Sequence, residues 1–147
     1  MSAKKEKTVF VQGAIPPEKV AQMITAHQSK QEIGAHSLFL GQVRADQIGE
    51  RRVAAIEYTA YEEMAGPVLH EIREAAFAAF DLTCCHIYHS LGRVNAGEIC
   101  FLVFTSSAHR KAATEGCQFL VEEIKAKVPV FGKEIFDDET HQWKVNV

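Results

Sequence analysis

The sequence predicts an α+β fold with a mainly antiparallel sheet and about three helices. Strand-like and helix-like segments alternate only in part, and short turn-like segments separate two pairs of β-rich runs, as in hairpins. One further segment keeps an apolar stripe at helical spacing for five turns. Because hairpins require antiparallel neighbours, a doubly wound parallel sheet is disfavoured. The length of 147 residues suits one compact domain spanning residues 1–147.

The N-terminal half predicts a strand, a helix and two further strands. The Pro16-Pro17 pair opens the helix, since proline is tolerated in a first helical turn, and Ile24 follows Val20 by four residues on its apolar face. Gly49 lies in a polar loop between the later strands. The expected elements are a strand at Thr8–Val11, a helix to about Gln28, a strand at His36–Arg44, the loop Asp46–Arg52 and a strand at Val53–Tyr61.

The C-terminal half predicts two helices around two central strands, followed by a last hairpin. Gly66-Pro67 is taken as the true start of the first helix, and Pro129 as the end of the second. The second helix carries its stripe at Ala113, Cys117, Leu120, Ile124 and Val128. The expected elements are a helix within Glu62–Phe80, strands at Cys84–Leu91 and Glu98–Ser106, a helix at Ala108–Val128 and a hairpin within Val130–Val147.

Charge and composition exclude several classes of protein. The chain has 16 Lys and Arg against 19 Asp and Glu, and a net charge of −3 does not suit a broad nucleic-acid footprint. An anionic ligand must therefore be held by a local basic cluster. No apolar run suits a signal peptide or a membrane helix, so we expect a cytoplasmic protein. The cysteines are expected to be reduced core thiols: Cys84, Cys85, Cys100 and Cys117.

The first candidate cluster lies around the end of the long helix. Lys125 is at the margin of the apolar stripe, and Lys133 and Glu134 follow the Pro129 stop and Gly132. Lys125 could simply extend to water beside Glu122. Alternatively, it is a partly desolvated ammonium of lowered pKa that neutralises an anion or transfers a proton.

The second cluster joins a strand to the long helix, in the sequence Thr105-Ser-Ser-Ala-His-Arg110. Polar groups before a helix can bind phosphate or carboxylate, and the guanidinium fork of Arg110 suits phosphate. Alternatively, Ser106 or Ser107 caps the helix while His109 and Arg110 are solvated.

The third cluster is the strand segment that runs from Phe39 to Arg44. Gly41 in its interior suits a close backbone approach, and Arg44 is either an anion ligand or a solvated strand end. His86 and His89 are three apart on a strand and face opposite ways, so we expect no zinc site; no cofactor motif is present either.

Four separated motifs together resemble the large subunit of molybdopterin synthase over nearly the whole chain, from about Thr8 to Trp143. They are the Phe39-x-Gly-x-Val-Arg44 strand, the segment from Glu57-Tyr-x-x-Tyr61 to Met64, the Thr105-Ser-x-Ala-His-Arg110 junction and the Lys125-x-x-x-Pro129 helix end. The resemblance implies a hammerhead-like α+β fold and a homodimer within a heterotetramer that carries a small ubiquitin-like sulfur-carrier subunit at each end. It also implies sulfur transfer from the thiocarboxylate of the carrier's Gly-Gly tail to cyclic pyranopterin monophosphate.

The resemblance assigns roles by position. Lys125 would be the principal catalytic residue, and Phe39 would line the pocket. The pterin phosphate would be bound by Arg44, His109 and Arg110, the last two from across the dimer interface. Glu134 would orient a lysine. The family commonly has a second functional lysine where this chain has Gly132, so we expect Lys133 to take that role.

Two other functions remain open at this point. A non-catalytic module could hold a ubiquitin-like tail in the same basic pocket. A hydrolase or acyltransferase built on His109 would need Ser106 or Ser107 as nucleophile and an orienting carboxylate, for which the sequence shows no clear candidate.

Overall fold

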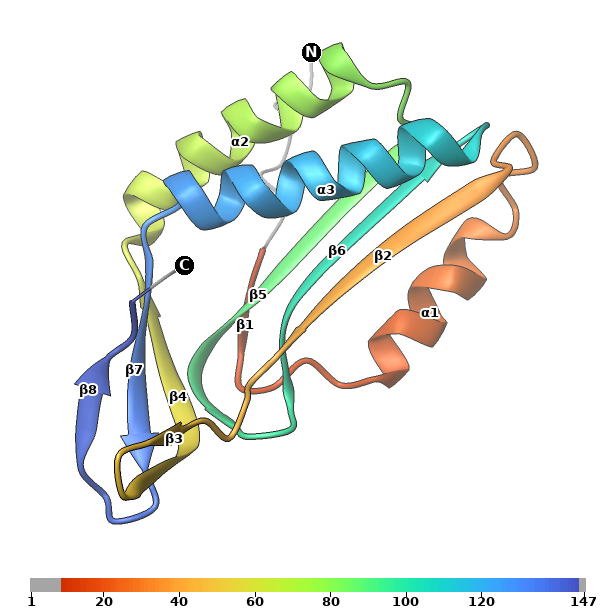
Figure 1. The fold of residues 1–147 in the computed structure, drawn as a ribbon. Helices are drawn as coiled ribbons and strands as arrows, with labels where there is room; N and C mark the ends of the chain where they lie inside the picture. Colours follow the sequence, from red (N-terminus) through yellow and green to blue (C-terminus); the bar gives the residue numbers. More distant parts are fainter. Residues whose placement is uncertain (1–8, 146–147) are drawn as a thin grey trace.

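The chain folds into an eight-stranded sheet with helices on both faces (Figure 1). The computed structural model describes residues 9–145, so Thr8, the expected start of the first strand, and residues 146–147, the expected end of the last hairpin, lie outside it. The described elements are β1 (Phe10–Gln12), α1 (Glu18–His27), β2 (Ala35–Gln42), β3 (Gln47–Ile48), β4 (Arg51–Ala60), α2 (Glu62–Ala79), β5 (Cys84–Asn95), β6 (Ile99–Ser107), α3 (Arg110–Lys127), β7 (Val130–Phe136) and β8 (His141–Trp143).

The strands follow the order β2-β6-β5-β4-β7-β8, with β1 beside β5 and β3 beside β4. The β1–β5 pair is parallel and the other pairs are antiparallel. The expected α+β fold with a mainly antiparallel sheet and three helices is therefore confirmed for residues 9–145. Both expected hairpins also form, as β5–β6 and β7–β8.

Strand β6 lies at the centre of the molecule and is covered on both faces. Phe101 and Val103 belong to the larger core, beneath α2 and α3. Leu102 and Phe104 belong to a second core, beneath α1. Two covered faces explain why the sequence of β6 reads as a continuous apolar run rather than an alternating one.

Strand β5 changes partners along its length. It pairs with β6 up to His89 and with β4 from Gly92 onward. Gly92 has φ of +80°, a conformation that glycine adopts without a steric penalty. The change of partner places His89 against Tyr58 of β4, with 5.0 Å between their ring centroids. This junction forms the floor of the pocket described below.

Helix α3 confirms the apolar stripe. Ala113, Cys117, Leu120 and Ile124 are all buried. The helix ends at Lys127, and Val128 has the extended backbone that proline imposes on the residue before it. Because α3 is held along its length, Lys125 in its last turn has a fixed position over the sheet.

Two details of the helices differ from expectation. Helix α2 begins at Glu62 rather than at Gly66-Pro67. Ala65 is fully buried and anchors a helical turn ahead of Pro67. Pro67 removes only one N–H donor from the helix. In α1 the buried residues are Met23 and His27, whereas Ile24 is 41% exposed. The face expected for α1 is therefore confirmed for Val20, which packs against the second core, and wrong for Ile24.

The four cysteines are free and buried, as expected. No helix within residues 9–145 is long and apolar enough to cross a membrane.

Candidate functional site

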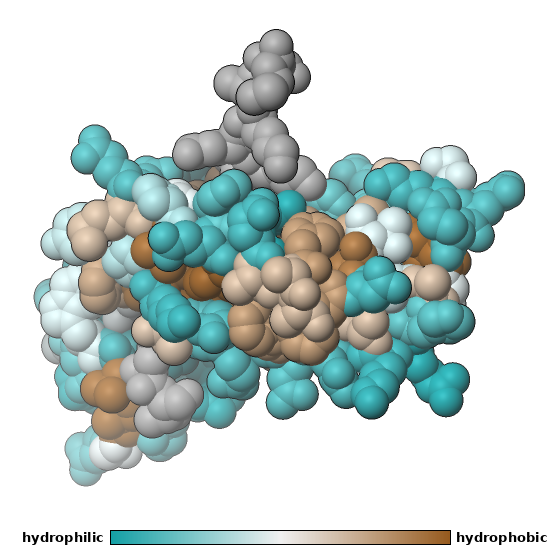
Figure 2. All heavy atoms as spheres, turned by 90° about the horizontal axis from the view of Figure 1, so that it is seen from above, coloured by the Kyte–Doolittle hydropathy of each residue, from teal (hydrophilic) through white to brown (hydrophobic). Residues whose placement is uncertain are grey.

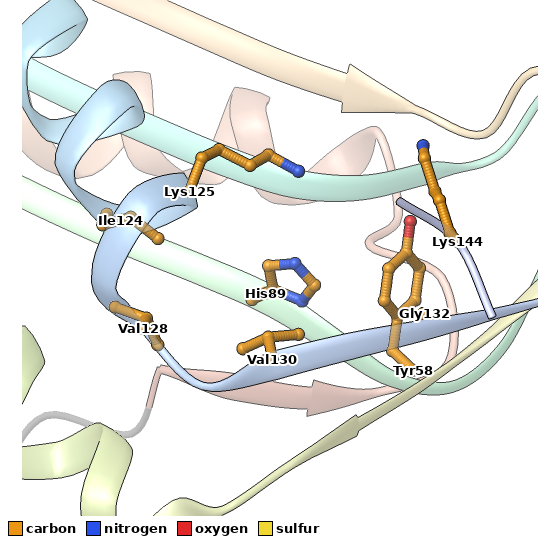
Figure 3. Close-up of a pocket in the computed structure, with 8 residues that line it drawn as sticks. All are labelled: Tyr58, His89, Ile124, Lys125, Val128, Val130, Gly132 and Lys144. Atoms are coloured by element: carbon orange, nitrogen blue, oxygen red, sulfur yellow. The ribbon is translucent and has the colours of Figure 1, made fainter. Parts of the chain in front are cut away.

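A pocket lies where the C-terminal end of α3 faces β4, β5 and β7 (Figure 3). Its polar groups are the side chains of Lys125, Lys144, Tyr58 and His89. Its apolar walls come from both sides of the Pro129 bend. The lining residues are Tyr58, His89, Ile124, Lys125, Val128, Val130, Gly132 and Lys144.

Lys125 extends into the pocket over the sheet. Its Nζ lies 5.2 Å from the ring centroid of Phe101, within cation–π range. The residue as a whole is exposed, yet desolvation of the ammonium lowers its pKa; Cys100 opposes this effect and the positive charge of Lys144 adds to it. Partial desolvation strengthens the attraction of this ammonium for an anion and eases its loss of a proton.

Lys144 brings a second ammonium to the pocket from just beyond β8. Its backbone N–H donates to the carbonyl oxygen of Gly132, 2.8 Å away on β7. Gly132 itself is tightly enclosed, since an added Cβ would lie 2.9 Å from Cγ2 of Ile56 and 3.3 Å from Cε1 of Tyr58. Gly132 on β7 and Lys144 on the neighbouring segment therefore both line the pocket (Figure 3).

The pocket floor is neutral. Nδ1 of His89 lies 2.8 Å from the carbonyl oxygen of Ser90, which can only accept, so this nitrogen carries the proton. Burial lowers the pKa of His89 to about 4, with Lys125 contributing. Burial also raises the pKa of Tyr58 well above its usual value, with Cys100 and Glu134 contributing. Near neutral pH the lining therefore combines two ammonium groups with an uncharged imidazole and phenol, an arrangement suited to an anion.

Lys133, expected from the sequence to act as the second functional lysine, is not among the residues that line this pocket. It follows Gly132 on β7 and so points to the other face of the strand. There its Nζ lies 3.6 Å from Oε1 of Glu57 and 5.9 Å from the ring centroid of Trp143. The flexibility expected of Gly132 is absent, because Gly132 is held between paired strands.

Phe39 and Glu134 lie near the pocket without being among its lining residues. Phe39 packs edge-to-face on Phe101, with ring centroids 5.7 Å apart, and so supports the ring beneath Lys125. Glu134 is buried on the Gly132 face of β7 and accepts a long hydrogen bond of 3.4 Å from Gln142. Within residues 9–145, Glu134 forms no ion pair with a lysine.

The three residues expected to bind phosphate lie elsewhere in the protomer. Arg44 is exposed and forms an ion pair with Asp46, at 3.3 Å. His109 and Arg110 are exposed at the N-terminal end of α3. Fifteen residues separate Arg110 from Lys125 on this helix, which corresponds to about 22 Å. One protomer therefore cannot place Arg110 and Lys125 on the same small anion.

The serines of this junction are not helix caps. His109 occupies the N-cap position, while Ser106 and Ser107 end the buried strand β6. Ser106 Oγ lies 2.7 Å from Nδ1 of His36, and Ser107 Oγ donates to the carbonyl oxygen of Asp81. Buried and bonded serines do not suit a hydrolase built on His109.

Sequence reasoning missed Lys144, and it considered His89 only as a metal ligand. The position of Lys144 in the pocket depends on how β8 pairs with β7, and no local sequence pattern encodes that pairing. His89 could have been found from its place in an otherwise apolar strand, since a buried titratable group near a predicted lysine site is a candidate for function.

Comparison with known proteins places this chain in a family. The MoaE protein family model matches residues 12–127. A molybdopterin synthase catalytic subunit from Pyrococcus abyssi is 37% identical over 110 residues, covering 75% of this chain and 74% of that protein. Three longer relatives of the same name, from a fruit fly, a fungus and rice, are 37–41% identical, and the chain spans 32%, 61% and 58% of their lengths.

Solved structures agree with this relationship. Molybdopterin synthase from Staphylococcus aureus has a TM-score of 0.80 and 29% identity, covering 93% of this chain and 96% of that chain. A chain from a complex of subunits 1 and 2 of molybdopterin-converting factor from Helicobacter pylori has a TM-score of 0.77 at 20% identity, covering 92% and 88%, and so shows the fold. The expected resemblance is confirmed: this chain belongs to the MoaE family, whose named members are molybdopterin synthase catalytic subunits, sulfur-transferring enzymes.

Proposed function

We propose that this chain transfers sulfur from the C-terminal thiocarboxylate of a small ubiquitin-like carrier to cyclic pyranopterin monophosphate, giving molybdopterin, as a cytoplasmic enzyme. One observation carries the proposal: two ammonium groups, on Lys125 and Lys144, enter a pocket whose other polar side chains are neutral. The thiocarboxylate and the pterin phosphate are both anions. In a protein with net charge −3, this pocket provides the concentrated positive charge that they require.

Lys125 is the group that would act on the reacting atoms. In each transfer, the thiocarboxylate sulfur forms a bond to a pterin carbon while a carbon–oxygen bond at that carbon breaks and the departing oxygen takes up a proton. Water then adds to the acyl carbon. The acyl–sulfur bond breaks, leaving a carboxylate on the carrier and a thiol on the pterin. Water addition produces an oxyanion, which an ammonium already desolvated beside Phe101 would stabilise.

Lys144 takes the supporting role that the sequence assigned to Lys133. Its charge lowers the pKa of Lys125, and it offers a second contact for the tail or the phosphate. A Gly-Gly tail suits such a site because a chain without side chains can lie close to walls such as Val128 and Val130.

The phosphate site is proposed to combine two copies of the chain. The distance of about 22 Å along α3 requires His109 and Arg110 to come from a second copy if they are to meet a substrate held by Lys125. Apolar side chains exposed on α1 and the sheet-edge strand β2 offer a surface for a homodimer; they are Ile24, Leu38 and Leu40. Arg44 and Glu134 keep their proposed roles in phosphate binding and lysine orientation.

The carrier is proposed to dock on the elements around the pocket. Four exposed apolar side chains lie on these elements, with Phe131 and Trp143 on the same face as Lys133: Tyr61, Met64, Phe131 and Trp143. The rings of Tyr61 and Phe131 are in edge-to-face contact. Figure 2 shows a patch of apolar residues among hydrophilic ones on the face seen from above, which is the side of α2 and α3 in Figure 1. The Helicobacter pylori relative in complex with its other subunit supports a two-subunit assembly, proposed here as a heterotetramer.

The experiment that tests this function combines the purified chain with the pterin and with either a thiocarboxylated carrier or the same carrier ending in an ordinary carboxylate. Molybdopterin formed only with the thiocarboxylate supports sulfur transfer. Carrier binding without any product from either form would contradict it and favour the non-catalytic binding module.

A further inference from the structure

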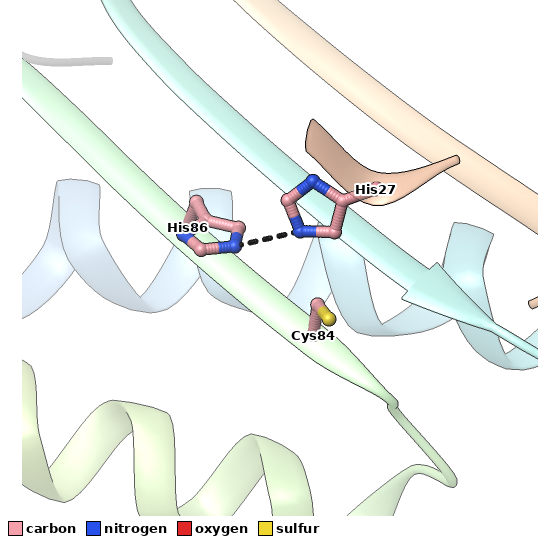
Figure 4. A group of neighbouring side chains, drawn as sticks. All are labelled: His27, Cys84 and His86. Carbon is pink, nitrogen blue, oxygen red and sulfur yellow. Dashed lines mark hydrogen bonds between the residues drawn. The ribbon is translucent and has the colours of Figure 1, made fainter. Parts of the chain in front are cut away.

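Three potential metal ligands meet on the face of the sheet beneath α1, away from the Lys125 pocket (Figure 4). Cys84 and His86 alternate along β5 and so share a face, and His27 is the last residue of α1. One ligand atom from each lies within 4.8 Å of the other two. The Nε2 atoms of His27 and His86 are 3.0 Å apart.

The orientation of His27 is fixed by the helix on which it lies. Its Nδ1 is 2.7 Å from the carbonyl oxygen of Met23, an atom that can only accept, so Nδ1 carries a proton and donates it. In neutral His27 the lone pair of Nε2 then points toward His86. A backbone carbonyl that holds one ring N–H while the other nitrogen faces the metal is the usual arrangement of metal-ligating histidines.

The distances suit a tetrahedral cation. Zinc–nitrogen bonds of about 2.0–2.1 Å at a tetrahedral angle place two imidazole nitrogens about 3.3 Å apart, close to the 3.0 Å between His27 and His86. The Cys84 sulfur needs only a small side-chain movement to complete a third bond of about 2.3 Å. Without a cation, a proton shared by the two Nε2 atoms holds the same geometry.

Lys30 is a polar neighbour of Cys84. Its Nζ donates to the Cys84 sulfur across 3.1 Å. Because Lys30 is exposed and has a long flexible side chain, it can turn to solvent when a cation arrives. His27 and Cys84 are buried, whereas His86 is only partly buried, which leaves an entry path.

We propose that His27, Cys84 and His86 form a binding site for Zn²⁺ or a similar thiophilic divalent cation, with water in the fourth position. One thiolate and two imidazoles select zinc, cobalt or nickel over magnesium or calcium, which prefer oxygen ligands. The cation would tie the C-terminal end of α1 to β5, adding to the small core of Ile15, Met23, Leu102 and Phe104.

Cobalt substitution tests the site directly in the full-length chain. The metal-free protein is titrated with Co²⁺ and then with Zn²⁺ while visible and near-ultraviolet spectra are recorded. We expect one Co²⁺ per chain, with the visible bands of a tetrahedral site and a thiolate-to-cobalt charge-transfer band that Zn²⁺ removes. Failure of the wild type to show the charge-transfer band would overturn the proposal.

Variants assign the ligands. Cys84→Ser should abolish the charge-transfer band, whereas Cys117→Ala, which removes a buried thiol on α3, should keep it. His86→Gln, at a partly buried position that tolerates the change, should weaken Zn²⁺ binding by more than about tenfold and remove any rise in Tm on adding zinc. A band that survives in Cys84→Ser, or unchanged Zn²⁺ affinity in folded His86→Gln, would contradict the site.

Discussion

Lys144 donates its backbone N–H to the carbonyl oxygen of Gly132, and both residues line the pocket, one with an ammonium and the other without a side chain. Ile56 and Tyr58 enclose Gly132 so closely that a larger residue would have to displace them. The second positive charge of the pocket therefore comes from Lys144, beyond β8, and not from the position of Gly132 on β7.

Replacing Lys144 tests whether this residue, rather than Lys133, supplies the second positive charge of the site. Lys144→Gln should lower the rate of sulfur transfer by about tenfold, the value of one charged contact of about 1.4 kcal/mol. Lys133→Gln is the matched control and should stay within about twofold of wild type, since Lys133 pairs with Glu57 on the other face of β7. The opposite ranking of the two variants in a single-turnover assay would return the role to Lys133.

The pH dependence of the rate should report the coupling of the two lysines. Desolvation and Lys144 lower the pKa of Lys125 from the ordinary 10.5, so activity that needs the ammonium should fall as pH rises through that lowered value. Removing the Lys144 charge raises the pKa of Lys125, and the alkaline limb of Lys144→Gln should move to higher pH. A limb that stays in place, or moves to lower pH, contradicts the coupling.

Burial of His89 should make the protein sensitive to acid. Its pKa is about 4 in the folded chain against 6.5 ordinarily, so below about pH 6.5 the unfolded chain binds a proton that the folded chain does not, and stability falls as pH falls toward 4. Between pH 7.5 and 4.5 this group should remove on the order of 2–3 kcal/mol.

Urea unfolding of wild type and His89→Gln across this pH range measures the effect. Tyr58, which contacts His89, and Lys125, which acts on its charge, remain in both proteins. The variant should therefore lose less stability on acidification. Parallel curves for the two proteins would mean that His89 is not held neutral by burial.

Subunit mixing tests whether a site combines two copies. Arg110→Ala and Lys125→Ala should each be inactive alone, because each damages every site. Random mixed dimers contain one intact site in half of the molecules, so an equal mixture should recover about a quarter of wild-type activity. No recovery, with subunit exchange demonstrated by differently tagged chains, would contradict the shared site.

The sequence predicted those features that local patterns encode. The stripe on α3 and its proline stop were sufficient to place Lys125. The face of α1 was predicted correctly at Val20 but wrongly at Ile24, because packing buries Met23 and His27 and leaves Ile24 exposed. The α2 boundary was wrong because the burial of Ala65 outweighs the local effect of Pro67.

Contacts between distant segments explain what the sequence could not show. Lys144 reaches the pocket only through the pairing of β8 with β7, and the lysine pair was therefore assigned to the nearer Lys133. His86 was compared with His89, which faces the other way, whereas its partner is His27, 59 residues earlier. The alternation of Cys84 and His86 was the available signal for that face of β5.

The most direct test of the account is single-turnover sulfur transfer by Lys125→Ala, beside Lys127→Ala, with thiocarboxylated carrier and pterin at saturating concentrations. Lys127 lies in the same helical turn but pairs with Glu123, 2.7 Å away and outside the pocket. The account predicts a loss of about a hundredfold or more for Lys125→Ala, with carrier binding retained and Lys127→Ala close to wild type. Wild-type rates from folded Lys125→Ala would contradict it.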